Sequence, residues 1–288
     1  MINNEKNIKF KNKRRKKIFW CLFAFLSVIV LLLFVFLKIN EGEKILQVSF
    51  LDVGQGDSSL IRTPEGKIIL IDGGPDNLTL RRLGEILPFY KRKIDLIIIS
   101  HFHDDHITGL IEILRRYRVS KIIYGPEIVD SSLFDILSAV ALENKTELAA
   151  IFSQAKVSLG HDCTVLSINP LSLKVKQDDN NSLITKLDCN FKIFLFSGDN
   201  GVAVEKVLLL KNIDIKADIF KASHHGSKTS NTGEFLRAVN PDSIIISVGL
   251  DNRFKHPATE TLKTMNQLGI KILRTDILGT IDIFSNIQ

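Results

Sequence analysis

Short apolar runs alternate with polar turns over most of the chain. Strands are predicted first at residues 45–51, 59–62, 67–72, 94–100 and 121–124, where apolar runs are separated by turns that contain Gly or Pro. Further strands are predicted at residues 165–168, 182–187, 192–197, 219–222, 243–248, 271–274 and 280–284. Helical periodicity is found at residues 79–90, 109–117, 134–143, 202–210, 233–239 and 258–268. Many strands mixed with helices predict a layered α/β domain rather than a bundle or a barrel.

The N-terminal region differs from this pattern. Residues 18–37 are apolar and uncharged, and a helix of about 20 residues spans roughly 30 Å, the thickness of the hydrocarbon layer. We therefore expect a transmembrane anchor, preceded by a basic cytoplasmic flank at residues 1–17. Residues 38–44 then form a linker, and residues 45–288 form one domain outside the membrane. A cleaved signal peptide is the alternative, which the long apolar run and the lack of an A-x-A-like cleavage site disfavour.

The formal net charge of +6 is concentrated in that basic flank. Eight of the 38 Lys and Arg residues lie there, against one acid, Glu5. The remainder of the chain is close to neutral. Bulk charge therefore gives no argument for tight non-specific binding of nucleic acid.

The three cysteines are too few for a disulfide framework and lack C-x-x-C spacing. Cys21 lies in the apolar segment. We expect Cys163 and Cys189 to be separate buried thiols, with a bridge between them outside the cell as the alternative.

Four potential metal ligands follow the apolar run that ends at Ser100. His101, His103, Asp105 and His106 form the pattern H-x-H-x-D-H. Neutral imidazoles and carboxylates are ligands that borderline divalent metals accept. Their close spacing after a buried strand favours one or two neighbouring ions, zinc or manganese, over the ordinary core or surface role of a single histidine.

Two later strands end at residues of the same kinds. Asp199, in SerGlyAspAsn, is a candidate ligand that bridges two metals, because a buried carboxylate is costly without a cation or a donor. His224 and His225 follow another strand, and either can bind metal while the other braces the site or donates a proton. As a working assignment, His224 binds metal and His225 assists catalysis. His161 stands apart and is expected to be an ordinary loop residue.

The ordered set of motifs resembles the metallo-β-lactamase superfamily. The set comprises IleAspGlyGly with Asp72, then H-x-H-x-D-H, SerGlyAsp and HisHisGly, and the resemblance covers about residues 47–284. A narrower set resembles the extracellular hydrolase domain of ComEC-type competence DNA-uptake proteins. That set is LeuAspValGlyGlnGlyAsp (51–57), AsnSerLeu (181–183), HisHisGlySerLysThrSer (224–230), His256-Pro257 and ArgThrAsp (274–276).

The resemblance implies a four-layer αβ/βα sandwich, here with one N-terminal transmembrane helix. It also implies one or two divalent metal ions and nuclease activity on DNA or another phosphodiester, the substrate being an analogy. The expected location is the cell membrane, crossed once, with the N-terminus cytoplasmic and the catalytic domain extracellular.

The chain departs from the superfamily in one ligand position. Members usually supply a further histidine before the bridging aspartate, whereas residues 177–182 read GlnAspAspAsnAsnSer. Asn181 or Asp179 is expected to complete the site, directly or through water. The membrane helices of the DNA channel are not in this sequence, so transport is not expected of it.

Other residues are expected beside the metal ligands or at the substrate. Asp57 either braces the site or makes local turn hydrogen bonds, and Asp72 orients the metal-binding turn or braces a loop. His256 either protonates a leaving group and binds phosphate with its basic neighbours or caps the following helix. Lys228 is expected to hold a substrate phosphate.

The expected reaction is metal-dependent hydrolysis. The metal activates water, Asp105 orients the nucleophile, and His225 or His256 assists the leaving group. One alternative is a thioester, lactone or β-lactam hydrolase on the same scaffold. Another is a metal-binding accessory of a surface DNA-uptake machine without catalytic activity, which the intact ligand set disfavours.

Overall fold

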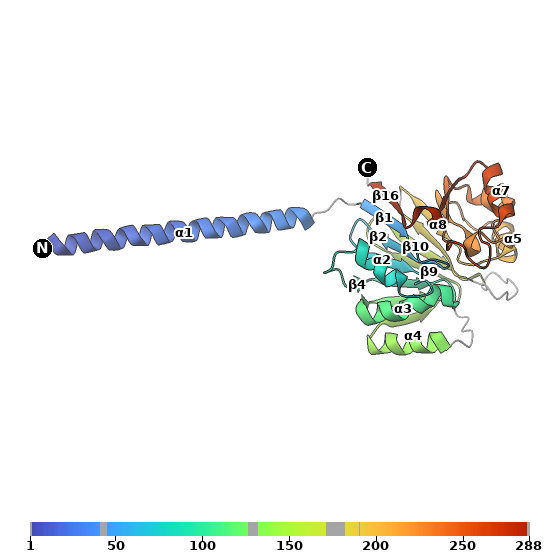
Figure 1. Ribbon diagram of the computed structural model, residues 1–288, viewed down its shortest axis with the longest axis horizontal. Helices are drawn as coiled ribbons and strands as arrows, with labels where there is room; N and C mark the ends of the chain where they lie inside the picture. Colours follow the sequence, from blue (N-terminus) through green and yellow to red (C-terminus); the bar gives the residue numbers. More distant parts are fainter. Residues whose placement is uncertain (1, 41–44, 126–131, 171–181, 190, 287–288) are drawn as a thin grey trace. The chain divides into compact units, whose positions relative to one another are not determined.

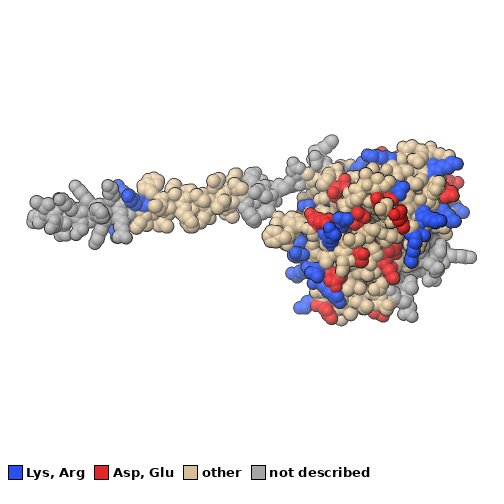
Figure 2. All heavy atoms as spheres, in the orientation of Figure 1, with Lys and Arg blue, Asp and Glu red and all other residues tan. Residues whose placement is uncertain are grey.

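The computed structural model describes residues 2–40, 45–125, 132–170, 182–189 and 191–286. Contacts divide the chain into two units, Met1–Glu43 and Lys44–Gln288. The first unit contains the helix α1 (Ile2–Asn40). Its stretch Arg15–Val35 has a mean hydropathy of 3.0 and is long enough to cross a membrane, a test that a signal sequence also passes. Among the side chains described in α1, Lys and Arg lie only at the start of that stretch (Figure 2).

The second unit is built on two seven-stranded sheets. The first has the order β16-β1-β2-β3-β5-β7-β8 and the second the order β15-β14-β13-β12-β11-β10-β9. The first sheet consists of β1 (Ile45–Phe50), β2 (Ser59–Arg62), β3 (Ile68–Ile71), β5 (Leu96–Ile99), β7 (Lys121–Tyr124), β8 (Glu147–Ala150) and β16 (Ile281–Asn286). The second consists of β9 (Gln154–Ser158), β10 (Thr164–Ile168), β11 (Ile184–Asp188), β12 (Ile193–Phe196), β13 (Ile219–Lys221), β14 (Ser243–Ile246) and β15 (Lys271–Arg274). β4 (Lys93–Ile94) and β6 (Arg118–Val119) form a separate small pair.

Helices cover the outer face of each sheet, so the unit has four layers (Figure 1). On the first sheet lie α2 (Leu78–Ile86), α3 (Asp104–Arg116) and α4 (Ser132–Glu143). On the second lie α5 (Val202–Leu210), α6 (Gly233–Val239) and α7 (Thr259–Gln267). The remaining short helices are η2 (Ser223–Gly226) and α8 (Thr275–Leu278). This arrangement confirms the α/β sandwich predicted from the sequence.

Three apolar cores hold the four layers together, and strand alternation determines which residues enter each one. In β5, Ile97 and Ile99 pack towards the helices, whereas Leu96 and Ile98 pack between the sheets. A strand covered on both faces is apolar throughout, as expected for parallel strands inside a sandwich. The central strands of both sheets are parallel neighbours, so their carboxyl ends meet at one edge.

Element boundaries differ from the prediction in a few places. α3 begins at Asp104, five residues before the predicted start at Gly109, with Asp104 and Asp105 in its first turn. Acidic residues are favoured there by the helix dipole. β8 and β9 were not predicted; both lie at the edge of a sheet, and their residues are only partly buried or exposed. The predicted helix 79–90 ends earlier, at Ile86.

The expectation of two separate thiols was wrong. Cys163 and Cys189 form a disulfide, with their Cα atoms 4.0 Å apart, while Cys21 is free. The antiparallel register of β10 and β11 pairs Thr164 with Asp188. The next residue outward on each strand is a cysteine, so the two thiols face each other across the ladder. The two cysteines are 26 residues apart in the sequence, so their spacing alone did not indicate that they pair.

Candidate metal centre

The candidate ligands lie where parallel strands of both sheets end. β5 leads to His101 and β3 to Asp72 in the first sheet, while β12 leads to Asp199 and β13 to His225 in the second. Carboxyl ends of parallel strands are the usual place for a site in layered α/β folds. The H-x-H-x-D-H turn and the later motifs are therefore brought together by the two sheets jointly.

Two glycines let α3 approach the loop after β3. A Cβ on Gly109 would lie 2.0 Å from the carbonyl oxygen of Gly73, and one on Gly73 would lie 2.5 Å from Leu110 Cγ. The absence of side chains permits backbone hydrogen bonds from Gly73 N to His106 O (2.6 Å) and from Gly109 N to Gly74 O (3.1 Å). These bonds hold the first turn of α3 against the loop that carries Asp72.

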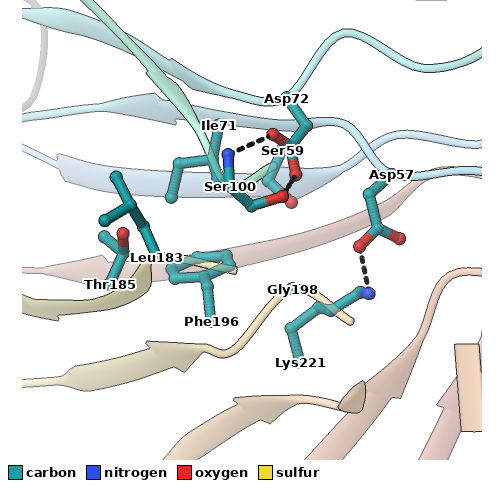
Figure 3. A pocket seen from close by; sticks show the side chains of 10 residues that line it. All are labelled: Asp57, Ser59, Ile71, Asp72, Ser100, Leu183, Thr185, Phe196, Gly198 and Lys221. Carbon is teal, nitrogen blue, oxygen red and sulfur yellow. Dashed lines mark hydrogen bonds and ion pairs between the residues drawn. The ribbon is translucent and has the colours of Figure 1, made fainter. Parts of the chain in front are cut away.

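His106 is fixed by the carboxylate of Asp72. Asp72 Oδ2 lies 3.0 Å from His106 Nδ1, and both side chains are buried. Asp72 also accepts hydrogen bonds from the backbone N (2.8 Å) and the hydroxyl (2.7 Å) of Ser100 (Figure 3). Burial would lower the pKa of His106, but the nearby carboxylates of Asp199 and Asp72 raise it well above its ordinary value, and a neutral ring with its proton on Nδ1 would offer Nε2 to a cation. Such a carboxylate behind a histidine is the usual support of a metal ligand.

His225 is held in a similar way from the second sheet. Its Nδ1 lies 2.9 Å from the carbonyl oxygen of Ser247 and 3.3 Å from Asp57 Oδ1. Its Nε2 lies 3.3 Å from Asp105 Oδ2. His224 (φ 49°) and His225 (φ 53°) both adopt left-handed backbone conformations. Such conformations cost about 1–3 kcal/mol each for residues other than glycine, and they cluster at active sites and ligand clamps.

Asp199 lies between the imidazoles. Its Oδ1 is 3.5 Å from His106 Nε2 and 3.9 Å from His225 Nε2, and its Oδ2 is 3.8 Å from His101 Nε2. Its backbone N donates to Ser182 Oγ (2.9 Å), which also lies 3.2 Å from His101 Nδ1. The carboxylate is therefore positioned to contact both parts of the cluster.

Several buried polar atoms of this cluster have no hydrogen-bond partner among the described residues. They are His101 Nε2, His106 Nε2, His225 Nε2 and Asp199 Oδ1. Leaving such atoms unpaired inside a protein is costly. Three nitrogens and a carboxylate oxygen that converge without partners fit a divalent cation. In the described part of the chain, three groups of side chains have the spacing of metal ligands: His101, His106 and Asp199; Asp105, His106 and His225; and Asp57, Asp72 and His106.

Mutual charges shift the pKa values of these groups in opposite directions. Burial alone would raise the pKa of Asp199, but His106 and His225 outweigh burial and hold it well below its ordinary value. Burial would lower the pKa of His225, but Asp57 and Asp199 raise it to about 9. Burial and the neighbouring His106 lower the pKa of His101 well below 6.5. Divergent shifts among clustered groups are typical of functional sites.

The remaining predicted residues lie at the margin of this cluster or outside it. His103 is half-buried, and its ring lies 4.4 Å from that of His101. His224 is partly exposed, with its Nε2 3.7 Å from Asp199 Oδ2. His256 lies beside His224, with ring centroids 5.6 Å apart. It does not cap α7, whose N-cap is Ala258.

Three further predictions concern Lys228, the slot at residues 177–182 and His161. Lys228 is exposed and makes no ion pair with a described residue. Asn181 and Asp179 lie outside the described residues. His161 is an exposed loop residue whose backbone N donates to Glu65 Oε1 (2.9 Å), as expected for an ordinary position.

Two residues of the site were missed by the sequence reasoning. Lys221 is 3% exposed and pairs through its Nζ with Asp57 (Figure 3), which in turn contacts His225. A lysine at the end of the apolar run IlePheLys was the available signal, because a buried lysine needs a partner. Ser182, the last residue of the slot that lacks the usual histidine, contacts both His101 and Asp199.

Comparison with known proteins extends these observations. Residues 51–139 match the model of the metallo-beta-lactamase superfamily. ComE operon protein 3 of Bacillus subtilis is 27% identical over 271 residues, which cover 88% of this chain and 34% of that protein. Recombination protein 2 of Haemophilus influenzae is 29% identical over 264 residues, which cover 88% and 31%. The chain spans about a third of the length of these relatives.

A solved structure agrees with the fold. The metallo-beta-lactamase fold protein YhfI from Bacillus subtilis superposes with a TM-score of 0.58 at 10% identity, covering 83% of this chain and all of that one. The fold and the His/Asp cluster suggest divalent metal binding and support a metal-dependent hydrolase in general, without specifying the metal. The chain therefore has the metallo-β-lactamase fold, and most of its length is similar in sequence to competence proteins of the ComEC type.

Proposed function

We propose that this chain is a membrane-anchored, metal-dependent phosphodiesterase that hydrolyses DNA outside the membrane. The observation that carries the proposal is the convergence of His106 Nε2, His225 Nε2 and Asp199 Oδ1 without hydrogen-bond partners among the described residues. These atoms need a cation, and a divalent cation in such a site supplies Lewis-acid activation of water and of a phosphoryl oxygen.

The roles proposed for His224 and His225 are the reverse of those expected from the sequence, so that His225 binds metal. In our proposal, Asp105, His106 and His225 hold one ion. His225 is buried and its Nε2 faces Asp105, whereas His224 is partly exposed at the edge of the cluster. His225 is therefore the better ligand, and His224 is better placed to meet substrate.

A second ion is assigned to the other side of Asp199. His101 and Asp199 hold it, with His103 beside His101 as a third ligand and Asp199 shared between the two ions. Ser182, the last residue of the slot that lacks the usual histidine, accepts a hydrogen bond from the backbone N of Asp199 and so holds the loop that carries this carboxylate. Two neighbouring ions suit in-line displacement at phosphorus, since both the attacking and the leaving oxygens need stabilisation.

The remaining residues of the site position water and substrate. Asp105 is partly exposed, so its carboxylate can orient an incoming water while it binds metal. His224 and His256 line the open edge, where they can hydrogen-bond the oxygens of the substrate. Burial lowers the pKa of His256 to about 4, so it is neutral at pH 7 and serves as an acceptor or a neutral donor.

DNA is proposed as substrate because of the competence relatives rather than the general charge of the molecule. The similar proteins are named as a ComE operon protein and a recombination protein. Acidic and basic side chains are interspersed over the visible face of the second unit, without one large basic patch (Figure 2). Local contacts must therefore hold the phosphates.

Two features support the membrane location. α1 contains a candidate span, Arg15–Val35, whose basic residues lie at its N-terminal end, which favours a cytoplasmic N-terminus. The disulfide between Cys163 and Cys189 favours an oxidising compartment for the second unit. Protease added to intact protoplasts is expected to remove this unit, while a cytoplasmic marker stays intact. Protection of the C-terminus under these conditions would reverse the orientation.

The enzymatic test uses the full chain in mild detergent, reconstituted with zinc or manganese. Cleavage of a labelled oligonucleotide is compared with hydrolysis of a thioester, a lactone and a β-lactam. His225→Ala is expected to lose most metal and at least about 100-fold in rate. His161→Ala, which removes an exposed histidine outside the cluster, should retain both. Hydrolysis of a thioester, lactone or lactam without cleavage of the oligonucleotide would exclude the proposed substrate class.

A further inference from the structure

A groove opens beside the candidate metal centre, on the side of Asp105. Its volume is about 460 Å³, and it is lined by Gln55, Pro75, Asp104, Asp105, Asn252, Arg253 and Phe254. Because Asp105 belongs to one of the ligand groups, a molecule in this groove would be adjacent to the bond being cleaved.

One wall of the groove is a stack of planar side chains. The Arg253 guanidinium lies over the Phe254 ring, with Cζ 4.7 Å from the ring centroid. The Phe254 ring is nearly parallel to that of His256, at 15° and 6.0 Å. Arg253 is exposed and Phe254 is 50% exposed, so planar surface and positive charge are both accessible. His256 in turn contacts His224 at the edge of the cluster.

The loop that carries the stack is held by its own hydrogen bonds. Asn252 Nδ2 donates to the carbonyl oxygens of Gly249 (3.0 Å) and His256 (2.7 Å), and its Oδ1 accepts from His256 N (2.9 Å). Phe254 is therefore displayed on a closed, braced loop. Such bracing reduces the entropy lost when a ligand binds.

Gln55 adds a further brace to this loop. Its Oε1 accepts a hydrogen bond from Gly249 N (3.3 Å). Gln55 therefore ties the loop of the stack to the residues that precede β2.

We propose that this groove binds a nucleobase of the strand being cleaved, stacked on the Arg253–Phe254 pair. The proposal rests on the phosphodiesterase function proposed above. Asp104 and Asp105 line the same groove and would repel a phosphate within it, so a neutral planar base fits better than the backbone. Guanidinium and aromatic planes stack on any base, which makes the subsite tolerant of sequence.

The test measures binding separately from cleavage. A labelled, cleavage-resistant phosphorothioate oligothymidylate is compared by fluorescence anisotropy with an abasic strand of the same length and linkage, using the full chain in detergent loaded with zinc. Both probes carry the same charge, so the basic N-terminal flank contributes equally. The wild type is expected to bind the thymidylate about tenfold more tightly than the abasic strand.

Substitutions in the stack test which residues cause the preference for the thymidylate probe. Phe254→Ala and Arg253→Met should reduce the difference between the probes to less than about threefold, and Phe254→Trp should retain it. Phe152→Ala, which removes a phenylalanine that is 74% exposed and outside the groove, is the matched control and should behave as the wild type. Zinc content verifies that each variant remains folded.

The outcomes separate this inference from the proposed function. Equal binding of the two probes by the wild type overturns the base subsite, as does equal weakening of both probes by Phe254→Ala. Preferential thymidylate binding that disappears in Phe254→Ala supports it. Absence of oligonucleotide cleavage by the metal-loaded wild type counts against the phosphodiesterase proposal alone, because the binding comparison does not depend on turnover.

Discussion

Asp72 Oδ2 lies 3.0 Å from Nδ1 of His106, in a contact from which solvent is excluded on both sides. This contact fixes which nitrogen of His106 faces the cluster. Asp72→Asn is expected to weaken zinc binding about 10–100-fold, because the amide no longer holds the ring as a charged acceptor. Competition with a chromophoric chelator measures the affinity. Asp135→Asn on the exposed face of α4 is the control, and unchanged affinity in Asp72→Asn would contradict the role assigned to this carboxylate.

Metal binding at pH 7 is expected to release protons. Asp57 and Asp199 outweigh burial and raise the pKa of His225 to about 9, so its Nε2 must lose a proton before it binds a cation. Zinc affinity should therefore rise with pH up to about 9. In the metal-free protein, the same shift stabilises the fold fully below about pH 6.5, and this contribution is lost as the pH rises through about 9.

Isothermal titration calorimetry in buffers of different ionisation enthalpy counts the released protons. At pH 7, binding of the ion held beside Asp105 and His106 should release about one proton fewer in His225→Ala than in the wild type. Equal release by both proteins would show that His225 is not the protonated ligand.

Gly109→Ala should strongly destabilise the second unit. The added Cβ would lie 2.0 Å from Gly73 O, a backbone atom that cannot move aside alone. We expect the free energy of unfolding to fall by about 3 kcal/mol. Gly84→Ala in α2 is the matched control, since nothing lies within 4 Å of its Cβ, and it should stabilise by about 0.5–1 kcal/mol. Chemical denaturation measures both, and a neutral Gly109→Ala would refute the close approach.

Thiol counting tests the disulfide. Denatured protein isolated from membranes under alkylating conditions should show one reactive thiol, Cys21, and three after reduction. Mass spectrometry of the alkylated peptides identifies each cysteine. Three thiols that react without reduction would contradict the bridge and weaken the argument for an oxidising compartment.

Periodicity was sufficient to predict most strands and helices, whereas the four-layer arrangement was predicted from the family resemblance. The central strands are apolar throughout because both of their faces are covered, and β3, β5 and β14 were placed within one or two residues. The motif after β5 was recognisable because its ligands are close in sequence. Edge strands such as β8 and β9 were missed, since their residues are partly exposed and carry a weaker pattern.

Contacts between distant segments could not be predicted. His224 and His225 are adjacent and of the same type, and only their left-handed backbone determines which ring turns into the cluster. The pairing of Cys163 with Cys189 depends on strand register. Lys221 meets Asp57 across 164 residues of sequence, and neither residue indicates its partner.

The candidate metal centre takes ligands from both sheets, which has a thermodynamic consequence. His101 and His106 follow a strand of the first sheet, whereas Asp199 and His225 follow strands of the second. A cation bound by both sets acts as a cross-link between two halves of the sequence that are otherwise joined through the central apolar core. Ion binding and the mutual docking of the halves are then one linked equilibrium. Chelation should first loosen the sandwich at the edge where the ligands meet, and amide hydrogen exchange after β5 and β12 should accelerate before exchange within the core strands.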